Sequence, residues 1–176
     1  DVPTPMASPQ PQRWVLEVVP LTGVHAGSIY GEEMTSSLGE PQLSGFNVRL
    51  FMPFRPGHYI GLDLGYFGLQ GNWSEDLYED TYTHVYSLVA YRHMRQSPGG
   101  MATAFVDLIP VLSRARLQHL YQNPDNEVQE GTHLGGKVRF GVGFNFGAFR
   151  IGMDVSATLT WSTALGAIEL FFGWNH

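Results

Sequence analysis

The sequence predicts an all-β protein, an eight-stranded antiparallel barrel whose strands follow one another in up-and-down order. Three observations predict it: segments in which apolar and polar residues alternate, connections that are alternately short and long, and a composition of 43% hydrophobic but only 15% charged residues. Alternation with a period of two is typical of strands whose two faces meet different surroundings. The 176 residues, with 21 glycines and no cysteine, suit one folded domain and exclude a disulfide scaffold.

The chain divides into a proline-rich N-terminal extension, residues 1–12, and a barrel over residues 13–176. Four prolines in the extension prevent helix and ladder hydrogen bonds there and favour an extended tether. The extension has neither a basic segment nor an apolar segment of a signal peptide, which is also expected of a mature exported protein.

Each strand is predicted from the residues on its more apolar face. In order, these residues are Trp14, Leu16 and Val18 in segment 14–24; Phe46, Val48, Leu50, Met52 and Phe54 in 45–54; Ile60, Leu62, Leu64 and Tyr66 in 59–67; Tyr82, Tyr86 and Leu88 in 82–92; Ala102, Ala104, Val106 and Leu108 in 102–112; Val138, Phe140, Val142, Phe144 and Phe146 in 137–146; Phe149, Ile151, Met153, Val155, Ala157, Leu159 and Trp161 in 149–161; and Ile168, Leu170, Phe172 and Trp174 in 166–176. Segment 82–92 has the weakest pattern, because its other face, with Val85, Val89 and Tyr91, is also partly apolar.

The connections predict that the two rims of the barrel differ. Those at 55–58, 94–100 and 147–148 are short and rich in turn-forming glycine and proline. Those at 25–44, 68–81 and 113–133 are long and polar, and the last one, Ser162 to Leu165, is brief. An up-and-down barrel would therefore carry long loops on one rim and short turns on the other, as outer-membrane barrels do.

The polar faces of the strands indicate which side faces inward. A soluble, lipocalin-like barrel would turn its apolar face inward and its polar face to water, which favours many Lys and Glu residues. Here the polar faces are rich in Gly, Ser, Thr and Asn, with one or two charges per strand at similar heights and of compensating sign. We predict that these charges form a network in the lumen: Glu17, Arg49, Asp63, Asp107, Lys137, Arg139, Asp154 and Glu169. Buried charges are tolerated when they are paired in this way.

The apolar faces, in contrast, carry no charge across the middle of the four clearest strands. A Lys or Arg at the lipid-facing midplane of a membrane barrel costs about 2–4 kcal/mol. Aromatic residues mark the strand ends and predict two interfacial girdles: Trp14, Phe46, Phe54, Tyr66, Phe146, Phe149, Trp161 and Trp174. No apolar run approaches the roughly 20 residues of a transmembrane helix. The prediction is therefore a transmembrane β-barrel.

After residue 12 the chain resembles the small eight-stranded outer-membrane barrels of OmpA-like and OmpX-like architecture. The resemblance implies a bacterial outer-membrane location, contact with outer-membrane lipid including lipopolysaccharide, and insertion by the barrel assembly machinery. Those families usually end in a strand of alternating apolar residues with a terminal aromatic. Here Ile168, Leu170, Phe172 and Trp174 keep the alternation, but His176 occupies the last position.

Enzymatic chemistry finds little support in the sequence. Barrel-type lipid A deacylases resemble serine hydrolases with a His-x-Ser element, and barrel palmitoyltransferases carry an adjacent Asp-Ser; neither element occurs here. His84 and His133 remain as isolated candidate bases, which are far more often rim residues than catalysts. We therefore predict no catalytic residues and no cofactor.

Metal binding also has a weak signal. Segment 68–81 holds Glu75, Asp76, Glu79 and Asp80 without a basic residue, so a solvated acidic loop and a hard-cation site both stay open. The spacing does not match an EF-hand loop, and the seven histidines form no zinc motif. No metal ligand is predicted.

The expected function is that of an envelope structural or surface-interaction protein with a lumen plugged by side chains. Arg114 and Arg116, in a segment that favours a short helix or an extended strand end, are candidate contacts to lipid phosphates. A protein partner is expected at the external loops or the N-terminal extension. The formal charge of −6 argues against nucleic acid. A soluble binder of apolar ligands and a lipid-modifying outer-membrane enzyme are the alternatives.

Overall fold

The computed structural model describes residues 14–20, 24–29, 32–36, 43–74, 77–121 and 127–176. The predicted N-terminal extension lies outside them. The described residues form ten strands: β1 (Val15–Pro20), β2 (Val24–Ile29), β3 (Glu32–Ser36), β4 (Leu43–Arg55), β5 (His58–Ser74), β6 (Leu77–Gln96), β7 (Ala102–Tyr121), β8 (Glu127–Phe146), β9 (Phe149–Thr160) and β10 (Thr163–Asn175). None of the described residues belongs to a helix long and apolar enough to cross a membrane.

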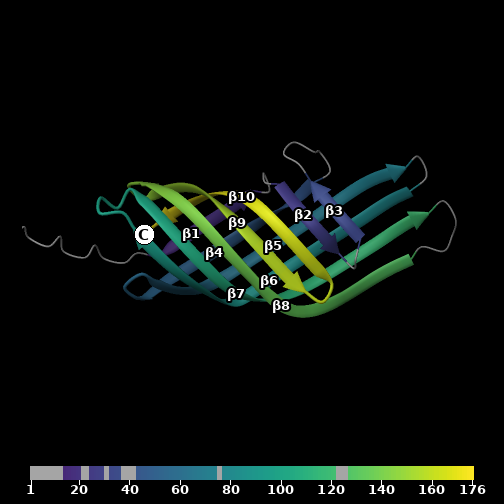
Figure 1. The fold of residues 1–176 in the computed structure, drawn as a ribbon, viewed down its shortest axis with the longest axis horizontal. Helices are drawn as coiled ribbons and strands as arrows, with labels where there is room; N and C mark the ends of the chain where they lie inside the picture. Colours follow the sequence, from purple (N-terminus) through teal and green to yellow (C-terminus); the bar gives the residue numbers. More distant parts are fainter. Residues whose placement is uncertain (1–13, 21–23, 30–31, 37–42, 75–76, 122–126) are drawn as a thin grey trace, which may run out of the picture.

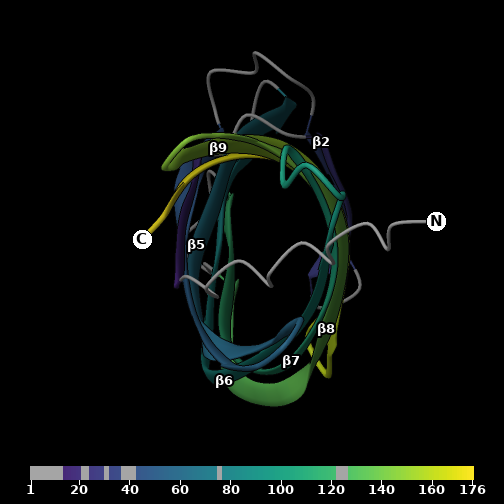
Figure 2. The same ribbon diagram turned by 90° about the vertical axis from the view of Figure 1, so that its left-hand side faces the viewer.

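Eight of these strands close into an antiparallel barrel in the order β1, β4, β5, β6, β7, β8, β9 and β10 (Figure 2). Closure is between the first and last strands, where Leu16 lies opposite Trp174 and Val18 opposite Phe172. Beyond that pairing, the N–H of His176 donates to the carbonyl of Trp14 at 3.0 Å and the two rings stack. The all-β, eight-stranded up-and-down prediction is confirmed.

The first predicted strand, 14–24, is wrong in its extent. β1 ends at Pro20, whose ring removes a backbone donor and so weakens ladder pairing. From Val24 the chain runs as β2 beside the other half of β10, where Val24 faces Ile168 and Ile29 faces Thr163. β2 then pairs with β3, so the connection predicted at 25–44 contains a hairpin outside the eight-stranded cycle.

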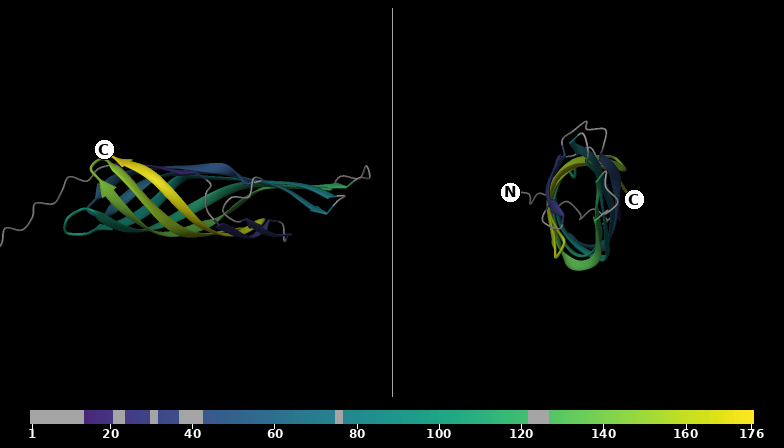
Figure 3. Two further views of the ribbon diagram at one scale, coloured as in Figure 1. Left: turned by 90° about the horizontal axis from the view of Figure 1, so that it is seen from above. Right: turned by 90° about the vertical axis from the view of Figure 1, so that its right-hand side faces the viewer.

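The predicted long loops at 68–81 and 113–133 are also wrong, because most of their residues are strand. The aromatic and β-branched residues of segment 77–83 favour extended backbone, and cross-strand partners exist for them. β5 and β6 pair out to Ser74 and Leu77, and β7 and β8 pair out to His119 and Glu127. These four strands project together beyond the barrel in Figure 1, and they extend furthest in Figure 3. A strand of 20 residues such as β7 rises by about 45 Å at a 45° tilt, well beyond an apolar band of about 25 Å.

A β-bulge explains the weak pattern of segment 82–92. Across β5 and β6, Asp63 faces Ser87 but Gly61 faces Ala90, so one extra residue is inserted in β6. The Ser87 hydroxyl donates to the carbonyl of Val89 at 2.8 Å within the bulge. Ser87 and Ala90 are both buried, whereas Val89 is exposed. The inward face therefore changes from odd to even positions within this strand.

The apolar face of the barrel points outward. Phe140, Val155 and Leu170 are all exposed although they lie mid-strand, and the alternate residues Arg139, Asp154 and Glu169 are buried. The short-turn rim carries exposed Trp14, Phe54, Phe146, Phe149 and Trp174, and the opposite rim carries exposed Phe46 and Trp161. This outward apolar surface with aromatic ends is the arrangement that the sequence predicts.

The short turns depend on glycine at positions of positive φ. Gly147, in the β8–β9 turn, has a φ of 66°, and a Cβ added there would meet no atom within 4 Å. Gly147→Ala is expected to lower the free energy of unfolding by about 1–2 kcal/mol through backbone strain alone. Gly136→Ala is the matched control, because an added Cβ there also meets open space but φ is not positive. Urea unfolding in lipid vesicles measures both, and equal midpoints for the two variants would contradict this account of the turn.

Candidate functional site

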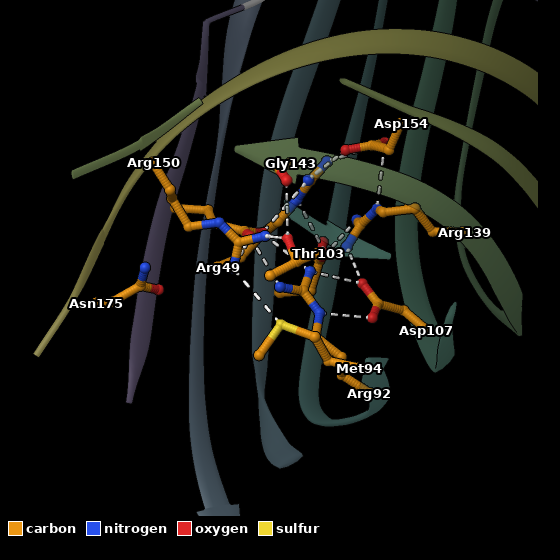
Figure 4. Close-up of polar contacts among 12 residues, drawn as sticks. Arg49, Arg92, Met94, Thr103, Asp107, Arg139, Gly143, Arg150, Asp154 and Asn175 are labelled. Carbon is orange, nitrogen blue, oxygen red and sulfur yellow. Dashed lines mark hydrogen bonds and ion pairs between the residues drawn. The ribbon is translucent and has the colours of Figure 1, made fainter. Parts of the chain in front are cut away.

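The lumen of the barrel holds the most distinctive group of side chains in the described part of the chain. Ten charged residues are buried there: Glu17, Arg49, Asp63, Arg92, Asp107, Lys137, Arg139, Arg150, Asp154 and Glu169. They come from all eight barrel strands, because each strand contributes the residue whose side chain alternates inward at mid-height. The eight residues predicted from the sequence are all in this set, and Figure 4 shows part of it.

Arg49 connects strands on both sides of the barrel seam. Its guanidinium donates to Asp154 at 2.6 Å and to Glu169 at 2.7 Å. The carboxylates of Glu17 and Asp63, which flank it on β1 and β5, lie 3.6 and 3.7 Å away. One cation on β4 is thus surrounded by four carboxylates from four other strands.

Arg139 has the same role on the opposite side of the lumen. Its Nη2 donates to Asp63 in a short contact, and its Nη1 donates to Asp107 at 2.8 Å. Asp154 lies 3.5 Å from its Nε. Asp63 and Asp154 therefore each contact both Arg49 and Arg139, so that seven of the eight predicted charges form one connected network. Lys137, one pleat higher on β8, is also buried and faces the same lumen.

Sequence reasoning missed Arg92, which holds the other end of the network. It makes paired hydrogen bonds of 2.7–2.9 Å to both Asp107 and Glu17. Its guanidinium carbon lies 3.9 Å from the ring centroids of both Phe51 and Phe105. The bulge in β6 explains why the sequence does not predict Arg92 in the lumen. Without the bulge, uniform alternation places Arg92 on the same face as Tyr82 and Leu88.

Arg150 was also missed. It lies close to the short-turn rim, where its Nη2 donates to Thr103 at 3.1 Å and its Nη1 lies 3.4 Å from Glu17. Its position on the polar face of segment 149–161 was visible in the sequence. To predict Arg150 as a member of the lumen network, one must also know the stagger between strands, which brings Arg150 near Glu17 on β1.

The charges in the lumen balance one another, and the charges outside the lumen are unevenly distributed between the two ends of the barrel. Five cations and five anions are buried, so five basic and eleven acidic residues remain outside this set. Six of those acids lie on β3, β6 and β8 at the long-hairpin end, at Glu32, Glu33, Glu79, Asp80, Glu127 and Glu130. At the short-turn end, the strand termini carry Arg55 and Arg95. Among the residues that the structure describes, acids therefore predominate at the long-hairpin end and arginines at the short-turn end.

Inward-facing side chains pack closely against one another in the described part of the lumen. Inward-facing glycines lie where a larger residue would collide: an added Cβ at Gly141 would overlap the ring of Phe105, and one at Gly143 would approach Arg150 at 2.9 Å. Phe105 and Phe171 pack edge to face, with their centroids 5.7 Å apart. Such packing is expected in a barrel of eight strands, whose interior side chains can just fill.

Arg114 and Arg116 lie on β7, not on a helix or a loop. Arg114 is exposed on the outer face, just beyond exposed Leu112, and its Nε and Nη2 donate to Glu130 on β8 at 2.9 and 2.6 Å. This pair marks the outer edge of the apolar belt. Arg116 is half-buried and faces Glu130 across the strand pair.

The geometry gives little support to the candidate catalytic and metal sites. Ser113 lies opposite His133 across β7 and β8, but its buried hydroxyl has no hydrogen-bond partner among the described residues, so no activated serine is formed. Glu75 and Asp76 of the acidic segment lie outside the described residues. Within the part that the structure describes, no group of three His, Asp or Glu residues is placed to hold a metal ion.

Comparison with known proteins identifies the architecture. No protein-family model matches the chain, and no curated protein matches it. Among solved structures, Ail, the attachment invasion locus protein of Yersinia pestis, aligns over 94% of this chain and 99% of its own, with a TM-score of 0.64 and 11% identity. The chain has the fold of the small outer-membrane β-barrels.

Two other barrels agree with this assignment. Neisserial surface protein A covers 93% of this chain and 96% of its own length, with a TM-score of 0.61 and 9% identity. The N-terminal barrel domain of Pseudomonas aeruginosa OprF covers 94% and 98%, with a TM-score of 0.51 and 13% identity. At such low identity the likeness shows the fold of an outer-membrane barrel.

Proposed function

We propose that this barrel resides in a bacterial outer membrane and acts there as a structural and surface-interaction protein, with no solute transport. The single observation that carries the proposal is the combination of a closed, charge-balanced lumen with strands that continue far beyond the apolar belt. A filled lumen leaves no path for solutes. The projecting β5–β8 strands are then the part of the molecule that can reach a partner.

The orientation of the side chains argues against a soluble, lipocalin-like binder. Such a protein needs an apolar cavity inside and a polar wall outside. Here Phe140 and Val155 face outward and Arg139 and Asp154 face inward. A lipid-modifying enzyme remains the second alternative, and incubation with labelled lipid A tests it through a change in acyl content.

The outer partners are proposed from charge. Ail has been crystallised with sucrose octasulfate, a heparin analogue. In this chain the long-hairpin segments carry ten acids against Arg114 and Arg116, so a polyanion would be repelled unless it meets those two arginines locally. We therefore propose a cationic protein surface as the principal partner, with phosphates of lipopolysaccharide contacting Arg114 and Arg116 at the edge of the belt. The N-terminal extension is a second place for a protein contact.

Biogenesis is proposed to use the barrel assembly machinery. On β10, Ile168, Leu170, Phe172 and Trp174 alternate on the exposed face and keep the pattern typical of a C-terminal barrel strand. The strand also closes the barrel against β1, so its recognition and the last closing step involve the same residues.

Location and surface exposure are tested together in cells that express the chain. We expect it in the outer-membrane fraction, with different gel migration before and after boiling, and with protease cleavage on intact cells confined to the hairpins beyond Leu112 and Leu134. Recovery as a soluble, monodisperse protein without detergent would contradict the proposal.

Transport is tested separately in planar bilayers. The purified barrel is expected to give no steady conductance, because we propose that the buried Arg49, Arg92 and Arg139 and their carboxylates plug the lumen at mid-height. A large-pore porin reconstituted in the same way is the positive control. Stable open-channel steps from the wild-type barrel would show that the lumen is a pore.

A further inference from the structure

A groove of about 550 Å³ crosses the outer wall of the barrel over strands β6 to β9. One row of cross-strand neighbours along it runs from Arg95 through Ala104 and Val142 to Met153. A parallel row begins at His93 and ends at Val155. The volume lies within the range of about 300–1,000 Å³ that is typical of small-molecule sites.

The groove rises from the rim toward the middle of the apolar belt. Arg95 is one residue from the end of β6, at the short-turn rim, whereas Val155 lies six positions beyond Phe149, where β9 begins. Six strand residues at a 45° tilt rise by about 14 Å, roughly half of an apolar band of about 25 Å. The groove therefore begins at the headgroup level and ends near the bilayer centre, with an apolar wall along its length.

Four basic residues lie side by side at the rim end of this groove: His93 and Arg95 line it, and His58 and Arg55 follow on the neighbouring strands β5 and β4. His58 lies opposite both Arg55 on β4 and His93 on β6, and the two imidazole rings are 4.8 Å apart. His58 is also within hydrogen-bond distance of the Tyr91 hydroxyl, at 2.6 Å. The Nδ1 atom of His93 is buried without a hydrogen-bond partner among the described residues.

This basic cluster lacks neighbouring acids. Every Asp and Glu within residues 46–66, 87–110 and 137–155 is one of the lumen carboxylates, which lie on the other side of the wall. Basic residues beside an apolar groove match the two parts of a phospholipid, whose phosphate is anionic and whose acyl chains are apolar. Guanidinium groups such as that of Arg95 bind phosphate in bidentate geometry.

From these observations we infer that the outer wall holds one anionic phospholipid of the periplasmic leaflet. An acyl chain lies in the groove over Ala104, Val106 and Val142, and the phosphate is bound by Arg95 with His93 beside it. The site rests on the proposed membrane location, with the short turns facing the periplasm. It is distinct from the lumen network and from Arg114 and Arg116 at the other rim.

Native mass spectrometry of the barrel in mild detergent, titrated with phosphatidylglycerol or phosphatidylcholine, tests the site. We expect one phosphatidylglycerol to be retained about tenfold more tightly than phosphatidylcholine, because the choline cation cancels the phosphate charge of the second lipid and is repelled by the arginines. Arg95→Gln is expected to remove this preference, and Ala104→Phe, which fills the groove, is expected to weaken both lipids. Leu159→Phe, which adds bulk to an exposed position of β9 near the opposite rim, is the control and should leave the preference unchanged.

Gel migration before and after boiling shows that each variant has formed a barrel. Equal affinity for the two lipids, unchanged binding in Ala104→Phe, or displacement of phosphatidylglycerol by lipopolysaccharide would overturn the inference. Failure of the membrane proposal has a different signature, because the wild-type protein would then be recovered without detergent.

Discussion

Replacement of Arg139 by methionine is expected to lower the free energy of unfolding by about 3–5 kcal/mol, the cost of leaving buried carboxylates without their partner. Arg139 contacts Asp63, Asp107 and Asp154, and all four side chains are buried. Methionine keeps much of the volume but supplies no charge and no donor. The three carboxylates would then share Arg49 and Arg92, which already bind Glu169 and Glu17.

The measurement is urea unfolding in the presence of lipid vesicles, followed by tryptophan fluorescence. Arg114→Met is the matched control, since that residue is also paired with a carboxylate but is exposed, and an exposed pair contributes at most about 1 kcal/mol. If Arg139→Met and Arg114→Met shift the midpoint equally, the lumen charges are solvated and the network does not stabilise the barrel.

Arg92→Met is expected to have a still larger effect, about 5 kcal/mol, because two contacts to aromatic rings are lost together with the ion pairs. Arg92 lies between the rings of Phe51 and Phe105 and binds both Glu17 and Asp107. Addition of Glu17→Gln to this variant restores the charge balance of the lumen. The double variant is expected to recover about 2 kcal/mol, within the range for coupled neighbours.

The control for this recovery is Arg92→Met with Glu130→Gln, which removes an acid outside the lumen and should recover nothing. The same urea titration measures these three variants and the Glu17→Gln single variant. Additive effects of Arg92→Met and Glu17→Gln would show that the two residues do not stabilise one another, and would contradict the network.

The alternation along the strands was sufficient to predict the barrel and the identity of most lumen charges. Segments 137–146 and 149–161 have unbroken periods of two, and their polar faces name Lys137, Arg139 and Asp154 directly. Each of these is buried in the lumen. The pattern is reliable there because lipid on one side and a crowded interior on the other impose opposite requirements on adjacent residues.

Two local features explain why the sequence did not predict Arg92 and the length of the outer hairpins. A single inserted residue near Ser87 reverses the inward face of β6, and no average over the segment can detect that, so Arg92 was not recognised. The extent of the outer hairpins is predicted wrongly because the polar composition of segments 68–81 and 113–133 favours loops. Outside a membrane, both faces of a projecting strand meet water, so polarity alone does not distinguish a strand there from a loop.

The central claim is that apolar side chains face lipid and charged ones face the lumen. Phe140 and Phe105 test it most directly, because they are the same residue type on paired strands, 58% and 3% exposed. In lipid nanodiscs containing a phospholipid spin-labelled in its acyl chain, paramagnetic relaxation of the two ring signals is measured by NMR. The account predicts strong broadening of the Phe140 ring signals and none for Phe105. Broadening of Phe105 with Phe140 unaffected would contradict it.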